Sequence, residues 1–591
     1  MTAASESSAR WNPMLDARWE LLQKPWLFVA CIAIMGALFR MHSLGRRSLW
    51  IDEAVSVALA QAPWSSFWRE VWDYESNMVF YYLLLRGWIH LGHSEFAIRS
   101  MSVAFGVAAI PAIYLLGKLL FNRETGRIGA ALLAVHAAHI QFSQEARSYS
   151  LLLLCLILST YFFALAIETA PRRTHWIAYL LLSTAAVYSH VLAVLILGAQ
   201  WLSLGFVRHR EMGLRTVLFI LGSLAVLVGP MVVFLLLHNS GQIDWIPRPT
   251  VRLIAHGLGF VTGGGVVLLF LAYVGACMIA AVSPASDKKR TFILPNNFHV
   301  RLLLYSVIFP IAFLIFFSLL YKPLFSYRYL GLCVPPMVLL AAHGVSSLRR
   351  RLAATHWDMP VALVVLLGLS VVGIQRYYRD SDRSGNDWRS ATRYLLKRQQ
   401  SGDAVIFYIP AGYRPFAYYA HRGIVGKASE PGLTVIFPGM GSNSEVRSPL
   451  TSQRIDQLTS DYKRIWVVLH HEDVAQRLSK SRPLSSHLGC EVGAEFPGKW
   501  PNGIRILLCS HRGRLSASDP EASHATAELA SDTWIRQATE NIIHSGDAQC
   551  QDVNMFEALV RTSNACTSTL RKALTNRAAT ASAPKKWQHG P

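Results

Sequence analysis

Charged residues are scarce in this sequence, and acidic residues are scarcer than basic ones. Only 16% of the 591 residues are Asp, Glu, Lys or Arg, whereas 52% are hydrophobic. Lys and Arg number 57 against 36 Asp and Glu, which gives a formal net charge of +21. The long apolar runs all lie before about residue 374, and the rest is ordinary polar sequence. Such a chain divides into two or three units, and its first part is that of a membrane protein.

Metal-binding cysteine patterns and concentrated basic patches are also missing. The eight cysteines form no Cys-x-x-Cys or Cys/His pattern, which excludes a zinc finger. The basic residues are spread over loops that flank apolar segments, so nucleic acid is excluded as a partner. Cys490 and Cys509 flank a predicted hairpin in the polar part, where they can form a disulfide.

Ten apolar segments predict a polytopic α-helical membrane protein. The fifth, Ile177–Val207, is too long for one crossing and contains Ser189-His190 near its middle. Basic clusters flank it on both sides, and it crosses twice if both clusters are cytoplasmic. About eleven transmembrane helices result. The other nine segments are Trp26–Met41, Phe96–Leu120, Ile128–Phe142, Leu151–Ile167, Val217–Leu237, Leu258–Val282, Leu302–Tyr321, Tyr329–Val345 and Val361–Ile374.

The charges of the loops predict the orientation. Arg172-Arg173, Lys288-Lys289-Arg290 and Arg349-Arg350-Arg351 lie in loops on one side, together with the basic N-terminal segment. By the positive-inside rule this side is the cytoplasm. The N-terminal segment lacks a small-residue cleavage pattern, so the first span is expected to be an uncleaved anchor. We expect a multi-pass protein of the inner (cytoplasmic) membrane with a cytoplasmic N-terminus and a periplasmic C-terminal part.

Three parts are expected along the chain. Residues 1–375 form the transmembrane domain, residues 376–512 a small extracytoplasmic α/β domain, and residues 513–591 a low-complexity, disordered tail. The predicted strands of the second part are Ala404–Ile409, Leu433–Phe437, Ile465–Leu469, Cys490–Phe496 and Ile504–Cys509, and its predicted helices are Asp387–Lys397, Ser452–Thr459 and Asp473–Leu478.

The first outer loop, Ser43–Glu95, is rich in aromatic residues and carries the adjacent carboxylates Asp52 and Glu53. Its tryptophans suit helices in the membrane interface. Carboxylates at a membrane boundary are costly unless they face a cavity or perform chemistry. The outer loops hold further candidates of complementary chemistry: the carboxylates Glu75 and Glu145, the cations Arg147 and Arg328, and the polar side chains Asn77, Tyr149, His190 and Tyr327.

These residue types suit the transfer of a sugar from a lipid phosphate to an acceptor hydroxyl. A carboxylate accepts the proton of the attacking hydroxyl. Fixed cations or a metal ion stabilise charge on the departing phosphate. Because a polyprenyl phosphate is already a fair leaving group, one base is sufficient and the reaction inverts the anomeric centre.

Each candidate also has a structural interpretation. Asp52 and Glu53 can cap and begin an interfacial helix. Glu145 and Arg147 can form an ion pair at a helix end. Arg328 can extend its charged end to the membrane interface. His190 can be a polar residue at a chain reversal. His136 and His139 are expected to be packing partners, and Gly263-Gly264-Gly265 a helix kink or loop.

The string Leu49-Trp50-Ile51-Asp52-Glu53-Ala54 resembles the acidic motif in the first outer loop of the GT-C glycosyltransferases. It is most similar to the protein O-mannosyltransferase-like group (family 39), whose bacterial members include lipid A aminoarabinose transferases. Further stretches similar to that group are Glu75–Leu85, Phe96–Ser100, Ser143–Ser150 and the late motif Tyr327–Leu330. The similarity covers roughly residues 26–387.

The resemblance implies a polyprenyl-phosphate sugar donor, an outward-facing site, and Asp52 as the base with Glu53 beside it. The remaining candidates are expected to bind or position substrates: Arg147, Tyr149, Tyr327 and Arg328 at the donor phosphate, and Glu75, Asn77, Glu145 and His190 at substrate or at a divalent ion such as Mg or Mn. Many relatives have a His-Pro-Pro or Lys-Pro pattern where this chain has Asn77-Met78-Val79, which offers a hard cation only an amide.

The predicted function is an inverting glycosyltransferase that acts on an outside acceptor, namely a glycan, lipid or protein hydroxyl. Membrane lipids are its other expected partners. The alternative is a transporter or flippase of lipid-linked sugars. Transporters tend to show inverted repeats and ionisable residues at mid-bilayer depth. The sequence has no convincing internal repeat and its spans are nearly free of such residues, which favours the enzyme.

Overall fold

The computed structural model describes residues 25–73, 76–169, 172–205, 213–237, 246–281, 297–351, 358–383, 387–421, 433–436, 452–470, 488–496 and 503–511. These residues form two compact units. The helical unit comprises the described residues up to 396 together with 411–421. The sheet unit comprises 397–410, 433–436 and the described residues from 452 onward. The predicted tail 513–591, the predicted helix Asp473–Leu478 and Glu75 lie outside the described residues.

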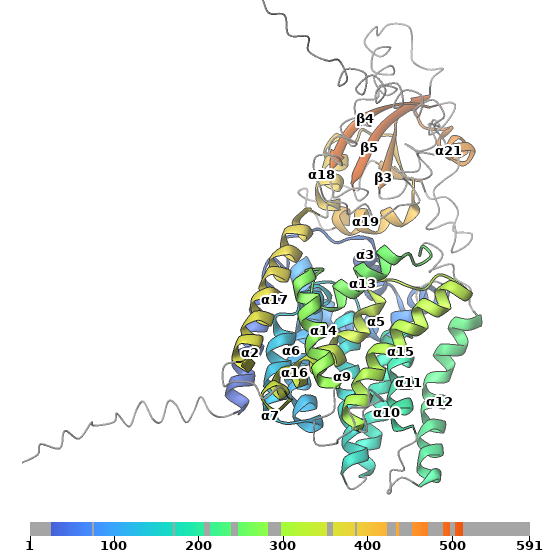
Figure 1. The fold of residues 1–591 in the computed structure, drawn as a ribbon. Coiled ribbons are helices and arrows are strands. Elements are labelled where there is room, and N and C mark those ends of the chain that lie inside the picture. Colours follow the sequence, from blue (N-terminus) through green and yellow to red (C-terminus); the bar gives the residue numbers. More distant parts are fainter. Residues whose placement is uncertain are drawn as a thin grey trace, which may run out of the picture. The chain divides into compact units, whose positions relative to one another are not determined.

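The helical unit confirms a multi-pass membrane protein (Figure 1). Among the described residues, six helices are long and apolar enough to cross a membrane. They are α6 (Glu95–Leu120), α9 (Tyr149–Glu168), α12 (Leu214–Leu237), α15 (Phe298–Leu320), α16 (Val334–Arg351, preceded by η3, Tyr329–Cys333) and α17 (Asp358–Arg383). Shorter apolar helices are α2 (Pro25–Met41), α11 (Ala193–Leu204), α13 (Val251–Val261) and α14 (Val267–Ala281). The count of eleven spans stays a prediction.

Three of the predicted segments are broken into two helices each. The long fifth segment becomes α10 (Arg173–Ser189) and α11, separated at His190 as its length indicated. The third becomes α7 (Arg123–Ala134) and α8 (Ala137–Ser143). The seventh is interrupted between α13 and α14 by Gly263-Gly264-Gly265, all with positive φ, so the predicted loop is confirmed.

A buried arginine explains the break between α7 and α8. Arg40 is 0% exposed and donates to the carbonyl oxygens of Leu133 and Ala134, which end α7, at 3.1 and 2.9 Å. It also lies 2.8 Å from Nδ1 of His139. His136 instead contacts the Val261 carbonyl oxygen through Nε2 at 3.0 Å. The bonds from Arg40 and His136 satisfy carbonyl groups that helix ends leave open.

The first outer loop folds into short helices. They are α3 (Ile51–Gln61), α4 (Trp64–Asp73), η1 (Ser76–Met78), α5 (Val79–Trp88) and η2 (Ile89–Leu91). On α4, Trp64, Trp68 and Trp72 are all exposed and recur every four residues, so they share one face. This face fits the helix expected to lie in the membrane interface.

The sheet unit confirms the predicted strand pattern. Its strands are β1 (Asp403–Phe407), β2 (Leu433–Val435), β3 (Ile465–His470), β4 (Leu488–Phe496) and β5 (Ile504–His511), in the order β2-β1-β3-β5-β4. β1 is parallel to β2 and β3, whereas β5 pairs antiparallel with β3 and β4. Helix α21 (Ser452–Thr459) also belongs to this unit, whereas α19 (Tyr413–His421) and all but the last two residues of α18 (Trp388–Arg398) belong to the helical unit; η4 (Pro410–Gly412) lies at the boundary in the sequence.

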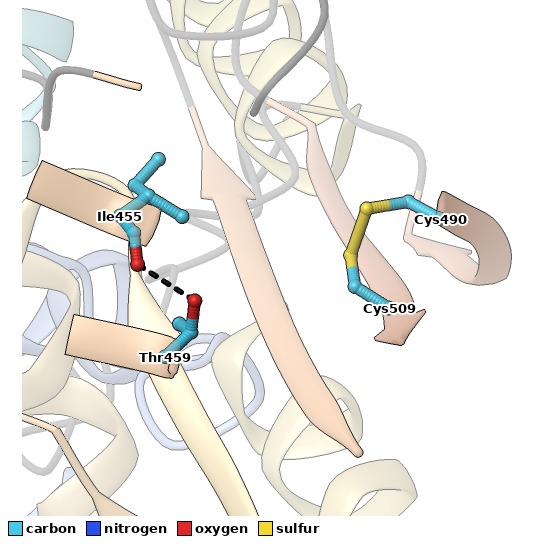
Figure 2. Close-up of a disulfide and its surroundings, with 4 residues drawn as sticks. All are labelled: Ile455, Thr459, Cys490 and Cys509. Carbon is cyan, nitrogen blue, oxygen red and sulfur yellow. Dashed lines mark hydrogen bonds between the residues drawn. A yellow bond between two sulfur atoms is a disulfide. The ribbon is translucent and has the colours of Figure 1, made fainter. Parts of the chain in front are cut away.

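A disulfide joins two strands of this sheet. Cys490 on β4 and Cys509 on β5 are direct register partners and are bonded to each other, as Figure 2 shows. This is the disulfide between Cys490 and Cys509 that the sequence indicated as possible. Buried apolar residues such as Ile455, Ile465 and Val467 form the core beside it.

Candidate active site

The two adjacent carboxylates lie in the first turn of α3, at one end of the helical unit (Figure 1). Oε2 of Glu53 accepts a hydrogen bond from the backbone N–H of Trp50 at 3.3 Å, so Glu53 caps the helix that it begins. Acidic groups in a first turn are also stabilised by the helix dipole. The structural interpretation of this pair is therefore correct, but it accounts for Glu53 better than for Asp52.

Glu53 is completely buried and paired with Arg99 of α6. The two carboxylate oxygens accept from Nε and Nη2 of Arg99 at 2.8 and 2.7 Å. The backbone N–H of Ala146 donates to Oε1 at 2.8 Å. A buried carboxylate with this many donors is held in one orientation.

Arg99 also holds the loop that precedes α3. Its other N–H groups donate to the carbonyl oxygens of Leu44, Arg47 and Ser48 at 2.8 to 3.0 Å. All five guanidinium donors are thus used inside the protein. The sequence pointed to Arg99 only as part of a family-like stretch and gave it no role. A charge in the first turns of an apolar span was the available signal.

Asp52 faces the other way and remains accessible. Its side chain is 35% exposed, and its Oδ2 lies 3.9 Å from Nη2 of Arg147. Nη1 of Arg147 also donates to the Asp52 carbonyl oxygen at 3.2 Å. Asp52 therefore combines an open carboxylate with a nearby fixed cation.

The second arginine approaches the same helix end from far along the chain. Nη1 of Arg328 donates to Oε2 of Glu145 at 2.7 Å, and its guanidinium lies 4.7 Å from the centre of the Trp50 ring. Burial alone would lower the pKa of Arg328, but the negative charge of Glu145 raises it well above the usual value. Arg328 is therefore permanently charged. It contacts the ring of Trp50, which precedes Asp52 by two positions in the sequence.

His190 and Asn77 form the other side of the site. Oδ1 of Asn77 accepts from the backbone N–H of Val191 at 2.9 Å, and its Nδ2 lies 3.4 Å from Nε2 of His190. Burial, and then the charge of Arg147, lowers the pKa of His190 to about 3. Asn77 thus stabilises the turn between α10 and α11, and His190 is neutral.

A small pocket adjoins these residues. Its lining is mostly apolar and includes two tyrosines, one histidine and one arginine. Its lining includes Phe142, Tyr149, Leu152, His190, Arg328 and Tyr329. Tyr329 was not among the predicted candidates, although it follows Arg328 in the late motif.

The described candidates among the predicted site residues are thus brought together at one end of the helical unit, with Tyr327 at the edge of the group. Tyr327 packs its ring against His256 and Phe260, with ring centres 5.2 and 5.1 Å apart. Its neighbour Arg328 lies 5.8 Å from the same ring. Glu75 is not among the described residues.

No group of three or more His, Cys, Asp or Glu suited to a metal ion occurs among the described residues. Glu53 and Glu145 are each bound to an arginine. A divalent cation prefers free oxygen ligands, and here it would have to displace one of these pairs or use Asp52 with water. A metal requirement stays a prediction.

The fold is similar to that of polytopic GT-C membrane enzymes. ArnT from Cupriavidus metallidurans has a similar structure in the apo state, with a TM-score of 0.54 and 13% identity over 84% of this chain and 98% of that chain. The structure of the same protein bound to undecaprenyl phosphate has a TM-score of 0.53, with 13% identity over 84% of this chain and 98% of that chain. The Archaeoglobus fulgidus oligosaccharyltransferase in the apo form gives 0.49, with 12% identity over 78% of this chain and 71% of that chain.

Residues 78–236 match the family model of dolichyl-phosphate-mannose-protein mannosyltransferases. No protein of curated function matches the chain by sequence. The family match confirms the mannosyltransferase-like resemblance and the expectation of a glycosyltransferase-type enzyme. At 13% identity the similarity to ArnT shows the fold alone.

Proposed function

We propose that the protein is an inverting glycosyltransferase that moves a sugar from a polyprenyl-phosphate donor to an acceptor hydroxyl outside the cytoplasm, with Asp52 as general base. The difference between two neighbouring carboxylates carries this proposal. Glu53 is fully buried and bound by Arg99, whereas the Asp52 side chain is 35% exposed beside Arg147. Only a carboxylate with an open oxygen can take a proton from an incoming substrate.

In the proposed step, the acceptor oxygen attacks the anomeric carbon of the donor while Asp52 takes the hydroxyl proton. The glycosidic C–O bond forms on the face opposite the phosphate. The bond between the anomeric carbon and the phosphate oxygen breaks, and its electron pair leaves with the lipid phosphate. Arg147 and Arg328 stabilise the negative charge that builds up on that oxygen.

The donor would bind at the pocket beside Arg328. Glu145 holds this guanidinium at 2.7 Å, and an arriving phosphate would compete with it for the same donors. The apolar lining beyond, which includes Tyr149 and Leu152, suits the first units of a polyprenyl chain. The undecaprenyl phosphate bound to the similarly folded ArnT supports this choice of donor class. Asn77 and His190 would maintain the wall of the pocket.

Two observations support an outside location for the site. The basic loop clusters are expected in the cytoplasm by the positive-inside rule. Disulfides persist mainly in oxidising compartments, which favours a periplasmic sheet unit with its Cys490–Cys509 bond. The proposed topology therefore has its N-terminus inside, its C-terminal part outside, and the inner membrane as its location.

The base assignment is tested with Asp52→Asn in membranes supplied with labelled polyprenyl-phosphate sugars. Loss of a general base should reduce transfer by about 10²- to 10⁴-fold. Binding of undecaprenyl phosphate, followed by tryptophan fluorescence, should persist and show that the variant is folded. Undiminished transfer would remove Asp52 as the base.

The configuration of the glycoside formed by the wild-type protein tests inversion directly. The opposite anomer from the donor is expected, and retention would contradict a single displacement. Neither the family match nor the fold favours the alternative of a flippase. Translocation of a lipid-linked sugar without glycoside formation would nevertheless overturn the proposed function.

A further inference from the structure

Helix α19 follows the last long helix by some thirty positions in the sequence, yet it packs against α3 within the helical unit (Figure 1). Its Tyr419 is 1% exposed. The hydroxyl of Tyr419 accepts hydrogen bonds from the backbone N–H of Leu49 at 2.8 Å and from Oγ of Ser48 at 3.2 Å. It donates to Oε1 of Glu95 at 3.0 Å. The hydroxyl therefore uses its one proton and both lone pairs.

Arg389 of α18 completes the same cluster. Its Nε and Nη2 donate to Oε1 of Glu95 at 3.2 and 2.6 Å. Nη2 also reaches the Gly45 carbonyl oxygen at 3.3 Å, and the backbone N–H of Arg389 donates to Oγ of Ser48 at 3.3 Å. Tyr419 and Arg389 thus hold the loop of residues 45–49, and Glu95 binds both of them.

Arg99 also holds this loop. Glu95 and Arg99 are four residues apart on α6, so they occupy the same helix face one turn from each other. Arg99 bonds to the carbonyl groups of Arg47 and Ser48 in the loop, to that of Leu44 just before it, and to Glu53. The loop that leads into Asp52 is therefore bonded to arginines of two charged pairs, Arg389 with Glu95 and Arg99 with Glu53, and only the second pair includes a residue of the acidic motif.

We propose that Tyr419, Glu95 and Arg389 form a positioning clamp that fixes residues 45–49 and, through them, the orientation of Asp52. None of the three is assigned contact with substrate, so they are positioning residues. The catalytic meaning of the clamp rests on the proposed function, whereas its effect on the loop does not. The clamp draws on residues that lie more than 290 positions apart in the chain.

The effect on the loop is measured by hydrogen–deuterium exchange of the full-length protein in nanodiscs. Tyr419→Phe removes the acceptor of the Leu49 amide but retains the ring. Tyr418→Phe is the matched control, since its hydroxyl donates to the carbonyl oxygen of His93 instead. Peptides that cover residues 44–52 should exchange about tenfold faster in Tyr419→Phe, because a buried amide loses its partner. Equal exchange in the two variants would overturn the clamp.

The effect on catalysis is measured with steady-state transfer assays. For Tyr419→Phe, kcat should fall about tenfold while KM for the lipid-phosphate donor stays unchanged, because Arg147 and Arg328 are left intact. Tyr418→Phe should keep both constants. A variant that exchanges faster but keeps its kcat would overturn the positioning role. A rise in KM alone would do the same, since it would place the effect at the donor.

The two proposals can fail separately. If the wild-type protein forms no glycoside from any polyprenyl-phosphate sugar, the proposed function and the catalytic role of the clamp are both overturned. The exchange experiment still decides whether Tyr419 fixes the loop, because it requires no turnover.

Discussion

The two units of this chain are ordered by different interactions. In the helical unit, the loop before Asp52 is held by buried charges, and Arg99 uses all five of its donors there. In the sheet unit, β1 and β3 are buried along their whole length with Asp403 as their one acidic residue, and a disulfide joins β4 to β5. Hydrophobic burial is not directional, whereas charged hydrogen bonds fix angles and distances. The buried charges of the helical unit therefore fix the position of the loop before Asp52. Loss of one partner of such a pair would destabilise the unit.

The largest effect is expected from breaking the buried pair of the helical unit. Arg99→Met removes the partner of Glu53, which is 0% exposed, and leaves an uncompensated buried carboxylate. Loss of one member of such a pair costs about 3–5 kcal/mol. We expect a strongly lowered melting temperature in detergent and loss of sugar transfer.

The double variant Glu53→Gln with Arg99→Met is the control for this experiment. It removes both charges, so much of the stability should return, because an apolar or neutral replacement of a whole pair is often tolerated. Transfer should stay low because the loop carbonyls lose their donors. Recovery of activity together with stability would show that the pair serves stability alone.

The same contrast explains what the sequence could predict. The strands and the disulfide of the sheet unit follow from local patterns, and so do the helix breaks at His190 and Gly263–Gly265. The position of Asp52 at the start of α3 was also predictable. The roles of Arg99 and Tyr419 were not, because each depends on partners at least 46 positions away. Local periodicity carries no information about such pairs.

Removal of the disulfide should act on the sheet unit. Cys490 and Cys509 are 19 residues apart. Closing a loop of this size stabilises a fold by about 3 kcal/mol in the chain-entropy account. The double variant Cys490→Ser with Cys509→Ser should lower the melting temperature of the sheet unit, measured by limited proteolysis at increasing temperatures. Sugar transfer below this melting temperature should change little.

Cys31→Ser, at an exposed free cysteine, is the control and should leave both properties unchanged. Loss of sugar transfer in the double variant below that melting temperature would show that activity depends on the disulfide of the sheet unit.

The smallest effect is expected at His190, where the helical unit buries a neutral group instead of a charge. Its pKa is lowered to about 3 by burial and then by Arg147, so the folded protein does not bind a proton there at pH 5. The unfolded chain does so below its ordinary pKa of about 6.5. The stability from this group is therefore complete above that pH and is lost progressively as the pH falls toward 3.

Between pH 7 and pH 5 this loss amounts to about 2 kcal/mol. His190→Gln cannot take up a proton, so its melting temperature should fall less over this interval than that of the wild-type protein. His42→Gln, at an exposed histidine, should behave like the wild type. The same pH sensitivity in all three proteins would mean that His190 is solvated and charged. The pocket beside Arg328 would then be a polar site, because a charged imidazole cannot line a groove for a lipid chain without a partner.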